Sequence, residues 1–361
     1  MVDTVSPVTT VRVDSDSALR EAASELRSAS RIALDTEFMR VDTYYPRLCL
    51  VQLGIPGTVF CVDPLAVGNL APLAPLLAEP LQAKLMHAAR QDLEALQVQG
   101  GLLVAPIVDT QVAAALLGLP EQAGYAYLVE HCCGIVLDKT QTRTDWAQRP
   151  LSEAQWHYAA QDVVWLEPVL DVLLQRLDAL GRRHWLAEEC ARLAPEETPP
   201  PWQRLKGLAQ WQGRDLAVAQ ALAEWREALA QRVDRPRAWL LRDETLYALA
   251  RQRPATTGDL ARLPAIAPGT VRRYGEELLE VVRTAARERA PRPQEAARLE
   301  PAQAALAAKL AARVRDCAAA LGIAPTTLAN RRDLERLASG QPVPRLASGW
   351  RREVLGDLAS V

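Results

Sequence analysis

A proline-rich segment divides this chain of 361 residues into two parts of different character. The segment runs Ala194-Pro-Glu-Glu-Thr-Pro-Pro-Pro201, and its four prolines can neither continue a helix nor donate hydrogen bonds to a sheet. Strand-like and helix-like runs alternate before it, whereas helical patterning rich in Ala, Leu and Arg fills the chain after it. These patterns predict an α+β or α/β domain, a linker and an all-helical region.

The part before the linker is predicted to form a mixed sheet flanked by helices. Short apolar runs indicate strands, and the Pro-Gly pair at 56–57 indicates a hairpin between two of them. The predicted strands are Arg31–Phe38, Leu48–Leu53, Thr58–Val62 and Lys84–His87. The predicted helices lie near 17–29, from about Arg90, and near 109–117, 124–133 and 152–179.

Two small helical bundles are predicted after the linker, separated by a second break at Ala290-Pro-Arg-Pro293. The expected domains are 1–193, 210–290 and 291–361, with the linker at 194–209. The predicted helices lie near 214–232, 243–251, 256–262 and 268–288, and then near 301–321, 325–338 and 346–358. Five tryptophans are expected to fill cores or interfaces here, and not to stack on bases: Trp202, Trp211, Trp225, Trp239 and Trp350.

The composition indicates a globular protein without a membrane span or a disulfide framework. Hydrophobic residues make up 49% of the chain and charged residues 24%, and no apolar run approaches the ~20 residues that cross a bilayer. The first residues, Met-Val-Asp-Thr-Val-Ser-Pro, lack the basic and apolar parts of a signal peptide. The six cysteines form no Cys-x-x-Cys pair, so we expect reduced thiols and a cytoplasmic location.

The net charge of −2 hides an uneven distribution. Residues 1–200 hold 15 Lys+Arg and 26 Asp+Glu, a balance of −11, while residues 201–361 hold 27 and 18, a balance of +9. An acidic region repels phosphates unless it binds cations, whereas a basic region attracts polyanions by releasing their counterions. The sequence therefore predicts a polyanionic partner for the second part; the alternative is that its arginines only solvate the helices.

Four carboxylates and a tyrosine are the candidate active-site residues in the part before the linker. Asp35 and Glu37 stand two residues apart at the end of a predicted strand, so their side chains point to one face. Tyr158 and Asp162 share a face of a predicted helix, and Asp92 lies near the start of another. Such an oxygen-only site suits Mg²⁺ or Mn²⁺, and two ions about 4 Å apart can promote phosphodiester hydrolysis. We expect Asp35 to bridge the two ions.

These motifs resemble the ribonuclease D family, within the DEDD superfamily of 3′–5′ exonucleases. Its three acidic motifs are matched by Asp35-Thr-Glu37, Asp92 and Tyr158-x-x-x-Asp162. Further matching segments are Asp109-Thr-Gln-Val-Ala-Ala, Leu137-Asp-Lys-Thr-Gln-Thr-Arg-Thr-Asp-Trp146, Arg149-Pro-Leu-Ser152 and Arg204-Leu-Lys-Gly207. Segments similar to HRDC domains are Glu224-Trp-Arg-Glu-Ala, Leu241-Arg-Asp-Glu and Arg273-Tyr-Gly-Glu. The resemblance covers nearly the whole chain.

The resemblance implies an RNase H-like sheet domain followed by two HRDC-like bundles. It implies an exoribonuclease that removes 3′-terminal nucleotides one at a time from RNA and releases 5′-monophosphates by two-metal-ion hydrolysis. The implied substrate is RNA with a free 3′ end, in particular tRNA precursors, and the implied protein is a monomer. Two alternatives remain: a DNA 3′–5′ exonuclease of repair or proofreading type, because nothing in the acidic site reads a 2′-hydroxyl, and a binding module with an inactive site.

The residue that orients the attacking water differs between the two branches of the superfamily, which carry Tyr-x3-Asp or His-x4-Asp. This chain offers both, because His157 precedes Tyr158. On a helix Tyr158 lies about 40° from Asp162 around the axis, whereas His157 lies about 140° away. We therefore assign the water-orienting role to Tyr158.

Six further residues are candidates for contact with the nucleic acid: Phe38, Met39, Gln52, His87, Lys139 and Arg143. A large apolar side chain at Phe38 can wedge against terminal bases, although packing in the core is the alternative. Lys139 and Arg143 lie in a polar loop and can hold phosphates, unless that loop is only solvated. For His87 the alternative is a buried histidine at a strand end.

Overall fold

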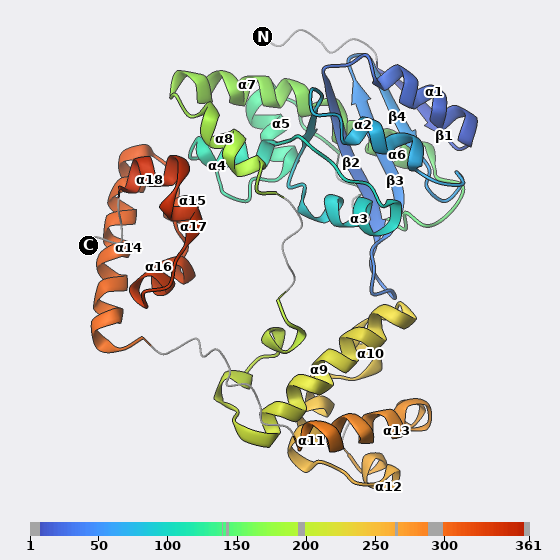
Figure 1. Ribbon diagram of the computed structural model, residues 1–361. Coiled ribbons are helices and arrows are strands. Elements are labelled where there is room, and N and C mark those ends of the chain that lie inside the picture. Colours follow the sequence, from blue (N-terminus) through green and yellow to red (C-terminus); the bar gives the residue numbers. More distant parts are fainter. Residues whose placement is uncertain are drawn as a thin grey trace. The chain divides into compact units, whose positions relative to one another are not determined.

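The computed structural model describes residues 8–138, 140–141, 144–193, 199–263, 266–287 and 299–356 (Figure 1). The chain forms two compact units. The first, here called the sheet unit, combines Met1–Met39, Pro46–Pro195 and Leu299–Val361. The second, the helical unit, combines Arg40–Tyr45 and Glu196–Arg298. The C-terminal helices therefore belong with the sheet and not with the helices that precede them.

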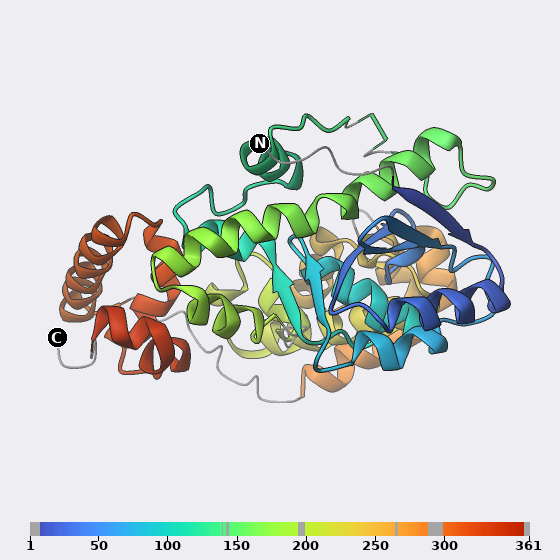
Figure 2. The same ribbon diagram turned by 90° about the horizontal axis from the view of Figure 1, so that it is seen from above.

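A six-stranded mixed sheet forms the centre of the sheet unit (Figures 1 and 2). In pairing order the strands are β1 (Thr9–Val13), β4 (Thr58–Val62), β3 (Arg47–Ile55), β2 (Arg31–Met39), β5 (Ala83–Met86) and β6 (Ile107–Asp109). Strands β2, β3 and β4 pair antiparallel, whereas β1 joins β4, β5 joins β2 and β6 joins β5 in parallel. The predicted mixed sheet flanked by helices and followed by all-helical segments is confirmed.

The sequence does not predict the two outermost strands, β1 and β6. Strand β1 has five residues, mostly exposed, and β6 has three. Strand β1 (sequence TTVRV) mixes Val with Thr and Arg and so lacks an apolar run, and β6 is too short to show a periodicity of two. The four central strands were predicted because each contains a group of buried apolar residues.

Helices cover both faces of the sheet. They are α1 (Asp16–Leu26), α2 (Ala74–Leu77), α3 (Arg90–Gly100), α4 (Thr110–Leu116), α5 (Tyr125–Cys133), α6 (Glu153–Val164), α7 (Leu166–Ala179) and α8 (Arg183–Cys190). Figures 1 and 2 show α6 on one face and α1, α2 and α3 on the other. Helix α6 packs against β1 to β4, and α3 packs against β2 and β3. The two helices thus approach β2 from opposite faces.

The prediction of a single helix over 152–179 is wrong, because the segment breaks at Trp165 into two helices, α6 and α7. In an unbroken helix the Trp165 N–H would donate to the Gln161 carbonyl. Here the Tyr125 hydroxyl lies between them, accepting from the Trp165 N–H at 3.1 Å and donating to the Gln161 carbonyl at 3.0 Å. A side chain inserted in the hydrogen-bond ladder is a recognised cause of a helix kink.

The C-terminal bundle of the sheet unit consists of α14 (Pro301–Leu321), α15 (Pro325–Leu328), α16 (Arg331–Ala338), α17 (Pro344–Ala347) and α18 (Gly349–Leu355). The predicted helix 325–338 divides because Asn330 leaves the helical conformation and caps α16. The bundle packs on α8, where Trp350 is fully buried and its ring stacks on Trp185 at 4.5 Å. Arg182 donates to the Leu321 carbonyl at 2.7 Å across the same interface.

The helical unit contains α9 (Gly213–Val233), α10 (Arg237–Leu240), α11 (Asp243–Gln252), α12 (Thr257–Ala261) and α13 (Pro268–Ala285). The segment Arg40–Tyr45 belongs to this unit: the Tyr44 hydroxyl donates to Glu227, and Asp234 accepts from two of the segment's backbone N–H groups. Of the tryptophans expected to fill cores or interfaces, Trp239 does not fill a core, because it is 61% exposed. The predicted domain limits at 193, 210 and 291 stay a prediction.

All six cysteines are free. Over the ranges that the structure describes, no helix combines the length and apolar character needed to cross a membrane.

Candidate active site

The end of strand β2 supplies the first two carboxylates. Asp35 pairs with Gln52 of β3, and Ala33 pairs with Gly54, so these residues share one face of the sheet. A Cβ placed on Gly54 would lie 3.3 Å from both Ala33 and Val163 of α6, which identifies this as the face that α6 covers. The register shifts directly after Glu37, and such a bulge bends the strand where the ligands end.

The third carboxylate, Asp92, reaches the site from the opposite face. It stands in the first turn of α3, where the helix dipole favours negative charge. The Thr36 hydroxyl, which alternation places on the face opposite Asp35, donates to Asp92 at 2.6 Å. Both residues are buried, so this bond fixes Asp92 beside the strand end.

Helix α6 brings Tyr158 and Asp162. Ser152 begins the helix with a capping box in which Gln155 is the reciprocal partner, so the helix is already formed at 157. The Tyr158 hydroxyl hydrogen-bonds the Asp162 carboxylate, and the Trp146 ring lies 6.0 Å from the tyrosine ring. His157 is exposed. The geometry therefore pairs Tyr158, and not His157, with the acidic residue.

Electrostatics show that the four carboxylates act on one another. Burial, followed by the charges of the other three, raises the pKa of Asp35 well above its ordinary value. Burial and the charges of Asp162 and Asp92 raise the pKa of Glu37 to about 9. Burial raises the pKa of Asp162 to about 7 and that of Asp92 to about 6. Burial and the neighbouring carboxylates thus disfavour the ionised forms of these groups, and bound cations would favour those ionised forms.

The site's residues fit divalent metal ions. All four charged groups are carboxylates, the ligands that hard cations prefer, and a cation removes the repulsion that raises their pKa values. Among the residues that the structure describes, no three His, Cys, Asp or Glu side chains are arranged closely enough to hold a metal ion. The fit therefore rests on donor chemistry and mutual electrostatic coupling, and the individual ligand roles stay predictions.

The predicted nucleic-acid contacts have different surroundings. Phe38 and Met39 are half-buried and pack against the core. Gln52 is fully buried and its amide has no hydrogen-bond partner in the described chain. His87 is half-buried and its Nδ1 lies 2.9 Å from the Thr110 hydroxyl. Lys139 and Arg143 lie outside the described residues, and contact with nucleic acid stays a prediction for all six.

Sequence reasoning missed two residues that support the site. Thr36 lies inside the first acidic motif, but nothing in the sequence pairs it with Asp92. Asp109 was noted only as part of a matching segment, although an Asp before a predicted helix is a signal for a capping residue. Its further contacts come from distant parts of the chain and leave no mark in the local sequence.

Two families match the chain. The family described as 3′–5′ exonuclease matches residues 10–178, which contain all four carboxylates and Tyr158. The family described as HRDC domain matches residues 215–282 of the helical unit.

Relatives match over nearly the whole chain. Ribonuclease D of Acidiphilium cryptum is 40% identical over 362 residues, covering 96% of this chain and 91% of the relative. Ribonuclease D of Gluconacetobacter diazotrophicus is 41% identical over 355 residues, covering 94% and 89%. The crystal structure of Escherichia coli RNase D, described as an exoribonuclease involved in structured RNA processing, is 33% identical with a TM-score of 0.89 and covers 98% of this chain and 99% of that chain.

Proposed function

The chain belongs to the ribonuclease D family and is a 3′–5′ exoribonuclease, and on this premise we propose that it trims 3′ extensions of structured RNA by two-metal-ion hydrolysis. The observation that carries the proposal is that α3, which holds Asp92, and α6, which holds Asp162, both pack on β2, the strand that holds Asp35 and Glu37. Bound Mg²⁺ or Mn²⁺ ions would neutralise the phosphate and lower the pKa of the attacking water.

Each residue then has a distinct task. Asp35 would hold both metal ions, because its carboxylate interacts with all three others. Glu37, Asp92 and Asp162 would complete the ligand set, directly or through water. The Tyr158 hydroxyl, held by its hydrogen bond to Asp162, orients the water for attack on the terminal phosphodiester. The water oxygen forms a bond to phosphorus while the bond between phosphorus and the 3′ oxygen of the preceding nucleotide breaks. The carboxylates accept the proton that the water loses, and the leaving 3′ oxygen takes a proton from solvent. The products are a 5′-monophosphate and an RNA shortened by one nucleotide.

The substrate is proposed to be the 3′ end of a tRNA precursor. The Escherichia coli relative is described as acting in structured RNA processing, and residues 201–361 carry a charge balance of +9. This basic region offsets the repulsion between RNA and the acidic part of the chain, because its cations release counterions from the phosphates. A cytoplasmic location and a monomeric state are the remaining predictions.

A digest of a 3′-extended tRNA with and without Mg²⁺ tests the proposal. We expect a ladder of products shortened one nucleotide at a time, and none when EDTA is present. Asp35→Ala should abolish cleavage and leave RNA binding largely intact, because it removes a ligand and no phosphate contact. A matched DNA oligonucleotide serves as the control: faster degradation of DNA than of RNA would show that the substrate is wrong, and cleavage in EDTA would show that the metal mechanism is wrong.

A further inference from the structure

The link between β5 and α3 determines where Asp92 points, because Asp92 follows this link by only three residues. The link contains Ala88 in a left-handed conformation, with φ of 54°. This conformation costs an alanine about 1–2 kcal/mol. Such backbone persists only where the surrounding structure holds it in place. The groups that hold this link in place therefore also help to position the proposed metal ligand Asp92.

Asp109, at the end of β6, holds the link by two backbone hydrogen bonds. Its Oδ1 accepts from the Ala88 N–H at 3.2 Å, and its Oδ2 accepts from the Ala89 N–H at 2.9 Å. Ala89 is the residue before α3, so its N–H is one that the helix itself cannot satisfy. Asp109 is 1% exposed, and inside the protein such bonds to a carboxylate are strong.

Helix capping alone does not explain these contacts. Asp109 also caps α4, accepting from the Gln111 N–H at 2.7 Å and the Val112 N–H at 3.3 Å. An N-cap residue needs only those bonds, and a serine or asparagine can make them. The second carboxylate oxygen of Asp109 instead accepts from the Ala89 N–H, directly before α3, and the negative charge strengthens this bond. The backbone N–H of Asp109 donates to the Cys190 sulfur at 3.3 Å, and this bond holds the backbone from which the carboxylate extends.

Thr110 holds the same link from its other end. Its hydroxyl donates to the Met86 carbonyl at 3.2 Å and lies 2.9 Å from Nδ1 of His87. The hydroxyl is fully buried. Two consecutive side chains of β6 and α4 thus bind four consecutive residues, Met86 to Ala89.

We propose that Asp109 and Thr110 are positioning residues for the metal site: they clamp the link 86–89 and thereby aim Asp92 at Thr36 and Asp35. Neither residue touches substrate or metal in this scheme, and both act through Asp92. The inference rests on the proposed metal site. It predicts that loosening the clamp weakens metal binding while the fold and the RNA contacts remain.

The test measures Mn²⁺ binding directly, from the loss of the free-ion EPR signal, in the full-length protein and in Asp109→Asn and Thr110→Val. Asparagine keeps one acceptor oxygen and loses the charge, while valine keeps the shape of threonine without the hydroxyl. We expect Asp109→Asn to weaken Mn²⁺ binding about tenfold or more, the usual effect of removing a group that orients a ligand, and Thr110→Val by a smaller factor. The kcat should fall at fixed Mn²⁺ in both variants, and the KM for RNA should change little in Asp109→Asn, which leaves the contact between Thr110 and His87 in place.

Asp333→Asn is the matched control, because Asp333 accepts from the Asn330 N–H at 2.9 Å to cap α16 in the C-terminal bundle. Circular dichroism and thermal unfolding establish that each variant is folded. Unchanged Mn²⁺ affinity in folded Asp109→Asn and Thr110→Val would overturn the inference. If Asp109→Asn does not fold, Thr110→Val alone decides it. A wild-type protein that binds no Mn²⁺ would instead overturn the proposed function.

Discussion

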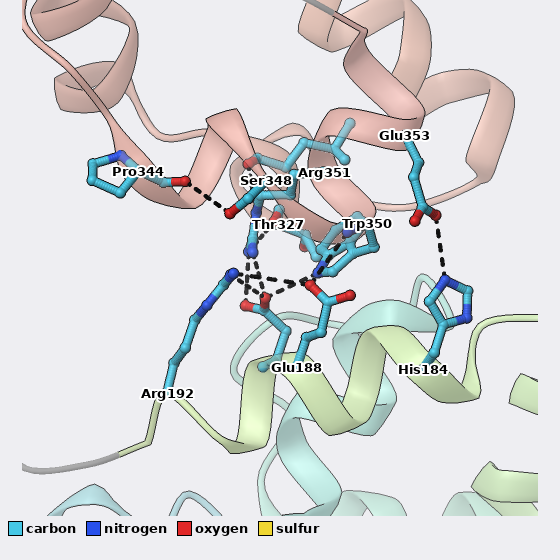
Figure 3. A network of polar contacts seen from close by, with 11 residues as sticks. His184, Glu188, Arg192, Thr327, Pro344, Ser348, Trp350, Arg351 and Glu353 are labelled. Atoms are coloured by element: carbon cyan, nitrogen blue, oxygen red, sulfur yellow. Dashed lines mark hydrogen bonds and ion pairs between the residues drawn. The ribbon is translucent and has the colours of Figure 1, made fainter.

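Arg351 of α18 forms a bidentate ion pair with Glu189 of α8, in an interface where the arginine is 3% exposed. Figure 3 shows Arg351 and Trp350 on the side of this interface that the C-terminal bundle forms. The guanidinium also donates to the Leu328 and Thr327 carbonyls, each at 2.9 Å. The Trp350 indole donates to the same glutamate at 2.9 Å. The arginine thus connects α8 to two segments of the C-terminal bundle and leaves few of its donors unused.

Arg351→Leu should release the C-terminal bundle from α8. Removing one partner of a buried ion pair leaves the other uncompensated and typically costs about 3–5 kcal/mol. We expect a value near the lower limit, because Glu189 keeps its bonds with Trp350 and Arg192. Urea unfolding measures the loss, and limited proteolysis should cut within the C-terminal bundle sooner than in the wild type.

Arg331→Leu provides the control for that prediction. Arg331 pairs with Glu335 one turn away on α16, and its side chain is 92% exposed. An exposed pair of this kind contributes well under 1 kcal/mol. Equal effects of the two substitutions would show that the Arg351 pair is no more important to the interface than a surface pair.

Tyr158→Phe should lower kcat by about 10²-fold or more, because it removes the hydroxyl that we propose to orient the water. His157→Ala should stay within about twofold of the wild type, since changes at exposed positions away from such groups are small. Single-turnover digestion of a 3′-labelled RNA at saturating Mg²⁺ measures both. A full loss in His157→Ala with normal activity in Tyr158→Phe would exchange the two roles.

Metal removal should make the stability of this protein depend on pH through Glu37. Its pKa of about 9 in the folded protein lies above the ordinary 4.5. Between these values the folded state keeps a proton that the unfolded state releases, so the unfolding free energy falls as pH rises. In EDTA the melting temperature should fall from pH 5 to pH 9, and Mg²⁺ should restore it by stabilising the ionised form.

Glu37→Gln tests the source of that pH dependence. The variant should melt higher than the wild type in EDTA at pH 8, because it removes a charge whose ionisation costs about 1.4 kcal/mol per unit of pKa shift. In Mg²⁺ the order should reverse, since glutamine is a poorer ligand. Glu21→Gln, an exposed change on α1, serves as the control. If the melting temperatures of all three proteins fall equally with pH in EDTA, ionisation of Glu37 is not the cause of the pH dependence.

Local periodicity made the relative placement of neighbouring side chains predictable and also set the limit of prediction. Asp35 and Glu37 could be placed on one face because strand alternation is a local rule. The helical angle likewise distinguished Tyr158 from His157. These inferences needed only neighbours within one element.

Contacts between distant segments escaped the same reasoning. The Thr36–Asp92 bond spans 56 positions, and the Asp109 carboxylate binds backbone 20 and 21 positions away. For Trp239 the sequence suggested a contact in a core that the structure does not show, because apolar character favours burial but does not guarantee it. Tertiary contacts decide such cases, and a single sequence does not record them.

Tyr125→Phe should change the junction between α6 and α7. The Tyr125 hydroxyl stands in for the missing helical bond between the Trp165 N–H and the Gln161 carbonyl. Without it both groups lose a partner unless the helix straightens to join them, so the cost should be about 1 kcal/mol. Tyr127→Phe on the same helix is the control, because Tyr127 is exposed and its ring stacks on His131. Hydrogen exchange at Trp165 measures the change: faster exchange in Tyr125→Phe alone supports the inserted hydroxyl, and identical protection in both variants contradicts it.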